Sequence, residues 1–437
     1  MKRILFAAAL MLLVPSGAWA QDAYGTADTL RLTLRQAQDY ALEHNRTLKN
    51  ASLSVRQAEA DRWSSIASML PQVNGTLDYS NYLGYSMNLG GMASIAMPPY
   101  GSLGVNASLA LSGAQVISAR IGTISMKMAD ISRQQTEQEI AEQVKLLYFS
   151  ALVSEHTLEL LKENLVTIRK LYEFSQKSVD VGVSEQVDAD QILVQVSTME
   201  TSINASQRAL EMVYNSLRLQ MNVDFDTDIR LTETLEDLLD VESSLGLLYE
   251  AFNIENNYSY RLALANIDLA RQQKYLAGWA YGPTLSAYYQ YTAREYFSDE
   301  ATMNMTPPNM IGVTLSVPIF SSGQRFGALR SARLAYQQQL NTLEDTEMSL
   351  RIQHRQLRYN LSSAYESYQT QKKNVEVSQS VFDNISKKYE FGLASSLDVT
   401  TSASNLISAQ SGYVQAAYEY VNARIELEKL LNKNYYE

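Results

Sequence analysis

Two aspartates stand just beyond two similar glycine turns in this sequence. Asp188 lies six residues after Gly182 in "VDVGVSEQVDA", and Asp398 lies six residues after Gly392 in "YEFGLASSLDV". Glycine often ends a helix in the left-handed conformation, and an acid in the first turn of the next helix is stabilised by the macrodipole by about 0.3–1 kcal/mol. Ser395 stands three residues before Asp398, which is the spacing of a capping box. Helix geometry alone therefore accounts for both acids, and a functional role needs further support.

The residue types that carry most enzyme chemistry are sparse. The sequence has no cysteine and three histidines, His44, His156 and His354. The lack of cysteine excludes disulfides, thiolate metal sites and a lipid anchor on an N-terminal cysteine. The histidines have neither the spacing of metal ligands nor a partnered nucleophile, and no HExxH or phosphate-binding glycine loop is present. These patterns predict a protein that is not an enzyme and holds no cofactor and no metal.

The first residues, "MKRILFAAALMLLVPSGAWA", combine two basic residues, an apolar run and a small-residue ending. This pattern is typical of a signal peptide, so residues 1–20 are expected to be removed and Gln21 to be the first mature residue. The chain has 47 acidic against 36 basic residues, a formal net charge of −11, and no basic run, which argues against nucleic-acid binding. No later apolar run reaches the about 18 residues of a membrane helix, so membrane insertion would require strands.

Two parts of the chain repeat one pattern. Offsets between 208 and 212 positions bring identical or similar residues together. The matched pairs include Asn45 with Asn257, Pro71 with Pro283, Gly182 with Gly392, Asp188 with Asp398, and Asn222 with Asn432. Offsets that differ by only a few residues indicate one duplicated unit with small loop changes. We place repeat one at about 32–223 and repeat two at about 245–433, both within an exported unit of residues 21–437.

Each repeat predicts the same order of elements. A helix of about 28 residues leads to a proline, and two strands, a helix of about 65 residues, a glycine turn and a helix of about 35 residues follow. The long helices carry mainly apolar stripes in steps of three and four, over 144–179 and 361–389, which is a coiled-coil seam. A helix of 65 residues is about 100 Å long. The two shorter helices together match that length, so we expect a tube wall in which long helices alternate with stacked pairs.

Apolar and polar residues alternate in two predicted β-hairpins, at about 72–111 and about 284–319. Strands of about ten residues with one apolar face are typical of a transmembrane β-barrel, although a half-buried sheet of a soluble protein has the same alternation. Tyrosines are placed as membrane-interface aromatics: Tyr79, Tyr82, Tyr288 and Tyr291. Every strand edge must be paired in hydrocarbon, and four strands are too few to enclose a barrel. Several copies of the chain are therefore expected to share one barrel.

With its duplication, hairpins and glycine turns, the sequence resembles the TolC-like outer membrane efflux protein family over almost all of the mature chain. The most specific parts are "GVTLSVPIFSSGQRFGALRSA" (312–332) and "YEFGLASSLDV" (389–399), whereas repeat one is more divergent. The resemblance implies a mixed α and β membrane protein. In that fold a homotrimer forms a 12-stranded outer-membrane β-barrel, four strands per chain, continuous with a periplasmic α-helical coiled-coil barrel.

The resemblance also implies a function. It predicts a passive exit duct of a tripartite efflux or type I secretion system, assembled with a periplasmic adaptor (membrane fusion) protein and an inner-membrane RND or ABC pump. A non-channel periplasmic coiled-coil scaffold stays open as the alternative. The exported substrate is not specified by the sequence, because in this family the pump selects it.

In the family the two glycine turns form the periplasmic tip, where the adaptor docks and the channel closes. The residues expected at the docking tip are Val181, Gly182, Val183, Ser184, Phe391, Gly392, Leu393 and Ser395. The residues expected at the gate are Glu185, Asp188, Asp190, Tyr389 and Asp398. The resemblance implies an acidic ring of Asp398 residues in the trimer, and a contact between Tyr389 and Asp188 that holds the tip shut. Thr401 and Ala394 replace an acid and an arginine of the family pattern, so this gate is expected to carry fewer charges.

Overall fold

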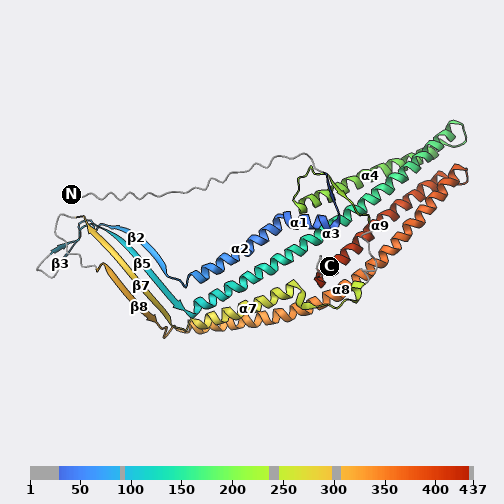
Figure 1. Ribbon diagram of the computed structural model, residues 1–437. Helices are drawn as coiled ribbons and strands as arrows, with labels where there is room; N and C mark the ends of the chain where they lie inside the picture. The colour runs from blue at the N-terminus through green and yellow to red at the C-terminus, as the bar shows by residue number, and fades with distance from the viewer. Residues whose placement is uncertain (1–28, 89–93, 236–245, 298–306, 433–437) are drawn as a thin grey trace.

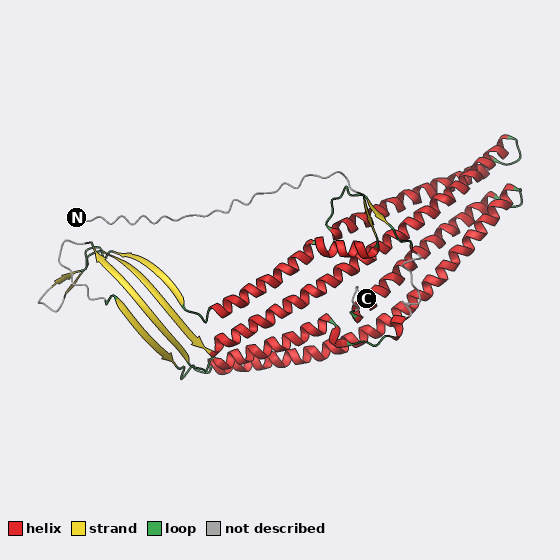
Figure 2. Ribbon diagram, in the orientation of Figure 1, coloured by secondary structure: helices red, strands yellow, loops and turns green. Residues whose placement is uncertain are grey.

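The computed structural model describes residues 29–88, 94–235, 246–297 and 307–432. The expected signal peptide and the expected ends of repeat two, at 245 and 433, lie outside the described residues. The molecule is long and separates into a block of strands at one end and a block of helices that extends away from it (Figure 1, Figure 2). Among the described residues, no helix combines the length and hydrophobicity needed to cross a membrane.

Four strands form one antiparallel sheet: β2 (Gln72–Ser80), β5 (Tyr100–Ser112), β7 (Thr284–Tyr296) and β8 (Asn309–Ser316). The expected hairpins correspond to β2 with β5 and β7 with β8. The strand order is β2-β5-β7-β8, so β5 and β7 join the two halves of the chain through 13 residue pairs from Tyr100–Tyr296 to Ser112–Thr284. The edge strands β2 and β8 each have one neighbour in this sheet, and each therefore presents an unpaired edge.

The register places the apolar residues of all four strands on one face. Leu111, Leu285 and Leu315 lie side by side on that face, as do Leu77 and Leu103. Leu77 is 83% exposed and Leu315 is 63% exposed, so this apolar face is uncovered in the single chain. A continuous, uncovered apolar face on a sheet of this size is what a lipid-facing barrel wall requires.

The four tyrosines expected at the membrane interface lie at different places on the sheet. Tyr288 lies on the polar face, where it pairs with Ser108 and with Gly312, because its side chain points opposite to that of Leu285. Tyr291 lies on the apolar face but is the eighth of the 13 residues of β7. Clustering of tyrosines in sequence hides the two-residue period that sends neighbours to opposite faces.

Tyr79 and Tyr82 lie at the end of the sheet that is remote from the helices. Tyr79 is the last residue but one of β2, and Tyr82 lies two residues beyond the end of that strand. The ring of Tyr79 lies 6.0 Å from that of Phe297, and the ring of Tyr82 lies 6.3 Å from that of Tyr100. Two shorter strands, β3 (Ser86–Asn88) and β4 (Ser94–Ala96), form a separate pair in the connection between β2 and β5. The aromatic group therefore marks the outer end of the sheet.

Two very long helices run from the sheet to the opposite end of the molecule, α3 (Gly113–Asp180, 68 residues) and α8 (Gln324–Glu390, 67 residues). Each is flanked by a pair of shorter helices: α2 (Arg46–Ala67) and α4 (Gln186–Met221) lie along α3, and α7 (Tyr258–Trp279) and α9 (Ser396–Leu431) lie along α8 (Figure 1). This is the expected alternation of long helices with stacked pairs. The two halves of the chain thus follow one order of elements.

Asparagines form the joints between the stacked helices. The side-chain oxygen of Asn45 accepts from the backbone of Thr47 and Leu48 at the start of α2, while its amide donates to the carbonyl of Gln220 at the end of α4. Asn257 caps α7 in the same way and donates to the carbonyl of Leu430 on α9. The side chain of each asparagine therefore caps the start of one helix and binds the end of the helix that is stacked on it.

The first helix is shorter than expected. A continuous helix of about 28 residues was predicted before Pro71, but α2 has 22 residues because Asn45 interrupts the helical path. A separate helix, α1 (Leu34–His44), precedes that break. It lies near the parallel pair of β1 (Leu30–Leu32) and β6 (Ile229–Leu231), about midway along the helical block. The sequence pattern did not reveal α1, because the helical period continues on both sides of the break.

An ion cluster, defined as Lys145, Arg424 and Glu428, links α3 to α9. The ammonium of Lys145 lies 2.5 Å from one oxygen of Glu428, and the guanidinium of Arg424 lies 2.9 Å from the other. The side chains of Lys145 and Glu428 are each 13% exposed. Burial would raise the pKa of Glu428, but the two cations outweigh it and hold that pKa below its ordinary value.

Candidate functional site at the helical tip

The two glycine turns lie together at the end of the molecule that is farthest from the sheet (Figure 1). In the first turn Gly182 has a φ of +76°, its N–H donates to the carbonyl of Val179, and the N–H of Val183 donates to the carbonyl of Ser178. These two bonds define a Schellman motif, which satisfies carbonyls that the end of α3 would otherwise leave free. Gly392 repeats the geometry with a φ of +70° at the end of α8. Glycine suits both positions because it adopts a positive φ without the strain that most side chains cause there.

Apolar side chains surround both glycines and point into solvent. Val181 and Val183 are 75% and 80% exposed, and Phe391 and Leu393 are 78% and 77% exposed. The two turns match position for position, since each places an apolar residue directly before and directly after its glycine. Exposed apolar side chains grouped at a remote end of a molecule are typical of a protein-binding surface. We call these four residues the tip surface.

The capping box at the start of α9 forms as its spacing predicts. The carboxylate of Asp398 accepts from the backbone N–H of Ser395 at 2.9 Å and from its hydroxyl at 2.7 Å, and the N–H of Asp398 donates to that hydroxyl at 3.1 Å. The hydrogen bond from the Ser395 backbone, with the one from its side chain, holds the pKa of Asp398 below its ordinary value. The side chain of Asp398 is exposed, so its charge faces solvent at the tip.

Asp188 has a different environment, although it matches Asp398 in the repeat. The residue directly before α4, at its N-cap, is Glu185, whose side chain makes no capping hydrogen bond. Asp188 is therefore not engaged in a capping box, and its carboxylate instead accepts from the hydroxyl of Ser396 on α9 at 2.6 Å. That hydroxyl also lies 3.0 Å from the side-chain oxygen of Gln191. The bond from Ser396 to Asp188 joins the two halves of the chain at the tip.

Tyr389 provides a second link between the halves. Its hydroxyl donates to the hydroxyl of Ser175 on α3 at 2.8 Å, and its ring lies edge-on to that of Phe174 at 6.0 Å. The expected direct contact between Tyr389 and Asp188 does not form within the chain, because Tyr389 faces α3 whereas Asp188, on α4, faces α9. We call the bonds Tyr389–Ser175 and Ser396–Asp188 the two tip links.

The sequence pattern did not single out Ser175 and Ser396 as functional. Ser175 is fully buried, and it is a polar member of the otherwise apolar stripe of α3. A serine in such a seam is a signal that a partner must satisfy its hydroxyl, but the sequence does not name the partner. Ser396 is 4% exposed and had no signal beyond its place after the capping serine.

The other expected gate positions are less engaged. Asp190 is exposed and accepts from the side chain of Gln186, one turn earlier on the same helix. Thr401 is exposed, and Ala394 packs against the apolar cluster inside the tip. That cluster includes Ile168, Ile192 and Phe382, so helices from both halves meet around it. No group of acids and histidines suited to a metal ion occurs among the residues that the structure describes.

The sequence profile of the outer membrane efflux protein family matches residues 37–222 and 253–433, one segment in each half of the chain. The chain belongs to the outer membrane efflux protein family. The outer membrane protein TolC of Vibrio cholerae is 22% identical over 438 residues, covering 99% of this chain and 95% of its own length. The probable efflux pump outer membrane protein TtgC of Pseudomonas putida is 22% identical over 424 residues, covering 92% and 84%.

Solved structures agree with this assignment at the level of the fold. The crystal structure of the Campylobacter jejuni CmeC outer membrane channel superposes with a TM-score of 0.74 at 17% identity, over 91% of this chain and 85% of that chain. The expected TolC-like membership is therefore confirmed. This efflux protein resides in the outer membrane, and its helical block lies in the periplasm. The glycine turns are then the periplasmic end of the molecule.

Proposed function

We propose that this efflux protein is the outer-membrane exit duct of a tripartite efflux or type I secretion system, and that it conducts its substrates passively. The observation that carries the proposal is the sheet: one face is apolar and uncovered, yet β2 and β8 leave two edges open. Open edges are not tolerated in hydrocarbon, so the sheet must be completed by other copies. Three copies would give a barrel of twelve strands, and the helices below would form a closed tube around one axis.

The same arrangement supports an ancestry by duplication. The two halves share an order of elements, equivalent asparagine joints and equivalent glycine turns. In a trimer such halves alternate as six similar units around the axis. The tip surface then occurs six times in a ring, which suits the binding of a periplasmic adaptor that connects the duct to an RND or ABC pump. Substrate choice and energy reside in that inner-membrane partner.

The proposal is tested by measuring conduction and export in parallel. Purified protein is expected to migrate as a heat-labile trimer and to conduct ions across planar bilayers. Replacing Val183 and Leu393 by aspartate should leave that conductance unchanged while export is lost in cells, because a charged tip surface no longer binds an apolar partner. A soluble, non-conducting rod would establish the alternative of a periplasmic scaffold.

Asp398 is proposed to form a ring of three carboxylates at the periplasmic constriction. Its carboxylate is exposed and its lowered pKa keeps it ionised, so three copies around a narrow axis would attract multivalent cations. Replacing Asp398 by alanine should weaken the block of single-channel current by trivalent cations. The block in the wild type should itself fade as the pH falls through the lowered pKa of Asp398. Asp226→Ala is the control, since Asp226 is also exposed but lies in the connection between α4 and β6, away from the tip. An unchanged block in Asp398→Ala would exclude such a ring.

A further inference from the structure

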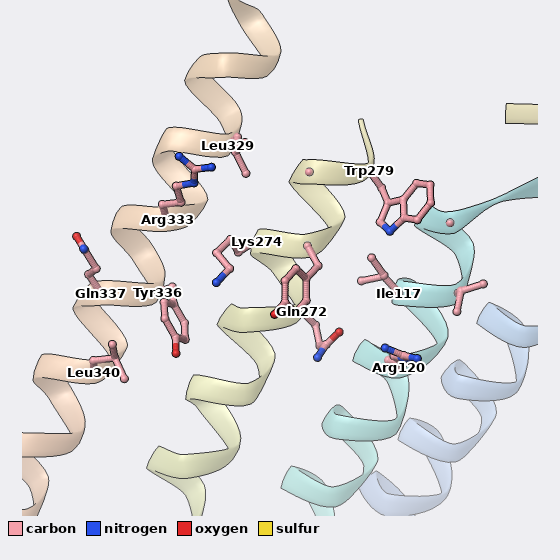
Figure 3. Close-up of a pocket in the computed structure, with 14 residues that line it drawn as sticks. Ile117, Arg120, Gln272, Lys274, Trp279, Leu329, Arg333, Tyr336, Gln337 and Leu340 are labelled. Atoms are coloured by element: carbon pink, nitrogen blue, oxygen red, sulfur yellow. The ribbon is translucent and has the colours of Figure 1, made fainter. Parts of the chain in front are cut away.

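A groove of about 1090 Å³ lies where the helices meet the sheet, lined by residues of α3, α7 and α8. Figure 3 shows Ile117 and Arg120 on α3, Lys274 and Trp279 on α7, and Arg333 and Tyr336 on α8. It lies at the opposite end of the helices from the tip surface. None of its residues takes part in the tip links or the ion cluster.

The groove opens on the apolar side of the molecule. An adjoining depression is lined by Leu111, Leu285 and Leu315, which share the apolar face of the sheet, together with Gly113 and Val116. Gly113 and Val116 also line the groove itself. The groove therefore continues the apolar surface of the sheet beyond the point where the strands end, on the side of the helices.

The charges in the groove are unusual for this chain. The protein has a formal net charge of −11, yet Arg120, Lys274 and Arg333 line the groove and no acid does. Among the residues that the structure describes, these three cations form no ion pair. Lys274 lies over the rings of Tyr336 and Tyr275 at 4.5 and 5.1 Å, which holds its ammonium at the groove. A concave surface with three unpaired cations is complementary to a phosphate group.

Aromatic side chains complete the surface. Trp279 and Tyr275 are 45% and 48% exposed, although both are large and partly apolar. The ring of Trp279 lies flat against the start of α3, where a Cβ on Gly113 would approach within 2.3 Å of it. Tryptophan and tyrosine are enriched where hydrocarbon meets headgroups, and basic side chains near them attract anionic lipids. The groove thus combines an apolar wall for acyl chains with cations for a headgroup.

We propose that this groove binds the phosphate headgroup of an anionic glycerophospholipid in the periplasmic leaflet, attracted by the cations Arg120, Lys274 and Arg333 that line it. Trp279 and Tyr275 lie along the upper part of the acyl chains. The bound lipid fixes the height of the barrel in the membrane at the junction between strands and helices. This role is separate from conduction and from the binding of a partner at the tip.

The fluorescence of Trp279 provides the test. In a Trp63→Phe background the mature chain retains Trp279 as its tryptophan. The full-length protein is placed in mixed vesicles in which either phosphatidylglycerol or phosphatidylcholine carries brominated acyl chains, which quench a nearby indole. Brominated phosphatidylglycerol is expected to be enriched at Trp279 by at least about fivefold, the factor that a single basic side chain near an anionic leaflet contributes. Equal quenching by the two lipids would refute the proposal.

Two triple variants separate this site from general surface charge. Replacing Arg120, Lys274 and Arg333 by glutamine should abolish the preference for phosphatidylglycerol while the channel still conducts. Replacing Lys170, Lys372 and Lys373, exposed cations lower on the long helices, by glutamine should preserve it. If the variant that lacks Arg120, Lys274 and Arg333 keeps the preference for phosphatidylglycerol, these three cations do not bind the headgroup. Loss of the wild-type preference in millimolar inorganic phosphate would also count against the proposal, because the ligand would then be a soluble phosphate.

Discussion

Replacing Tyr389 by phenylalanine and Ser396 by alanine together should produce a channel that conducts several times more current than the wild type. The two substitutions remove both tip links, the bond to the buried Ser175 and the bond to the carboxylate of Asp188. Leaving such partners unsatisfied costs about 1–3 kcal/mol each. Because about 1.4 kcal/mol corresponds to a tenfold change in an equilibrium, the joined state of the tip loses at least a factor of ten in population.

Single-channel recording in planar bilayers measures this effect directly. The matched control is Tyr418→Phe with Ser408→Ala. Tyr418 is 42% exposed on α9, and the hydroxyl of Ser408 bonds to a carbonyl of its own helix; neither hydroxyl makes a hydrogen bond to the first half of the chain among the described residues. The control should conduct as the wild type does. If the double variant at the links also does so in an intact trimer, the two bonds do not hold the gate.

Replacing Lys145 by methionine should destabilise the helical block by about 1.5–3 kcal/mol, because it removes a charged hydrogen bond and leaves the buried carboxylate of Glu428 with a single cation. The unfolding midpoint in urea, followed by the helical circular dichroism signal, measures the loss. Arg351→Met is the comparison. It removes an ion pair between Arg351 and Glu347 whose side chains are 68% and 38% exposed, so its effect should stay below about 1 kcal/mol.

The same cluster predicts a dependence on pH. The pKa of Glu428 is lower in the folded protein than in the unfolded chain, so its contribution to stability is complete above its ordinary pKa. That contribution declines as the pH falls through the lowered pKa of the folded state. Replacing Lys145 by methionine and Glu428 by glutamine together should recover part of the stability. It should also reduce the change in unfolding free energy with pH in the acid range. If the double variant is as acid-sensitive as the wild type, other carboxylates cause the loss of stability at low pH.

Periodic features of the sequence predicted most of the fold. The long helices, the hairpins and the glycine turns each rest on a local pattern: the stripe of α3, the alternation around Leu77, and the left-handed requirement at Gly182 and Gly392. The pairing of β5 with β7 and the break at Asn45 were not predicted. Both depend on contacts between residues far apart in the chain, such as Asn45 with Gln220, which a local pattern does not encode.

The candidate site was predicted unevenly for the same reason. The capping box of Ser395 and Asp398 is local, so its spacing was sufficient to predict it. The link from Ser396 to Asp188 spans 208 positions. It also depends on Glu185, which stands directly before α4 where α9 has its capping serine, so that Asp188 is not held in a capping box. The resemblance to the family located the tip, but the partners of Tyr389 and Asp188 in this chain required the structure.

The asparagine joints have a mechanical consequence for the channel. Because α4 ends at the joint with α2, and α9 ends at the joint with α7, only α3 and α8 run unbroken from the tip to the sheet. Each of these two helices is about 100 Å long and is fixed at one end by its connection to the sheet. The shorter helices between the joints and the sheet, α2 and α7, are separate segments that move with α3 and α8. Dilation of the periplasmic end would therefore have to bend two continuous helices in each chain.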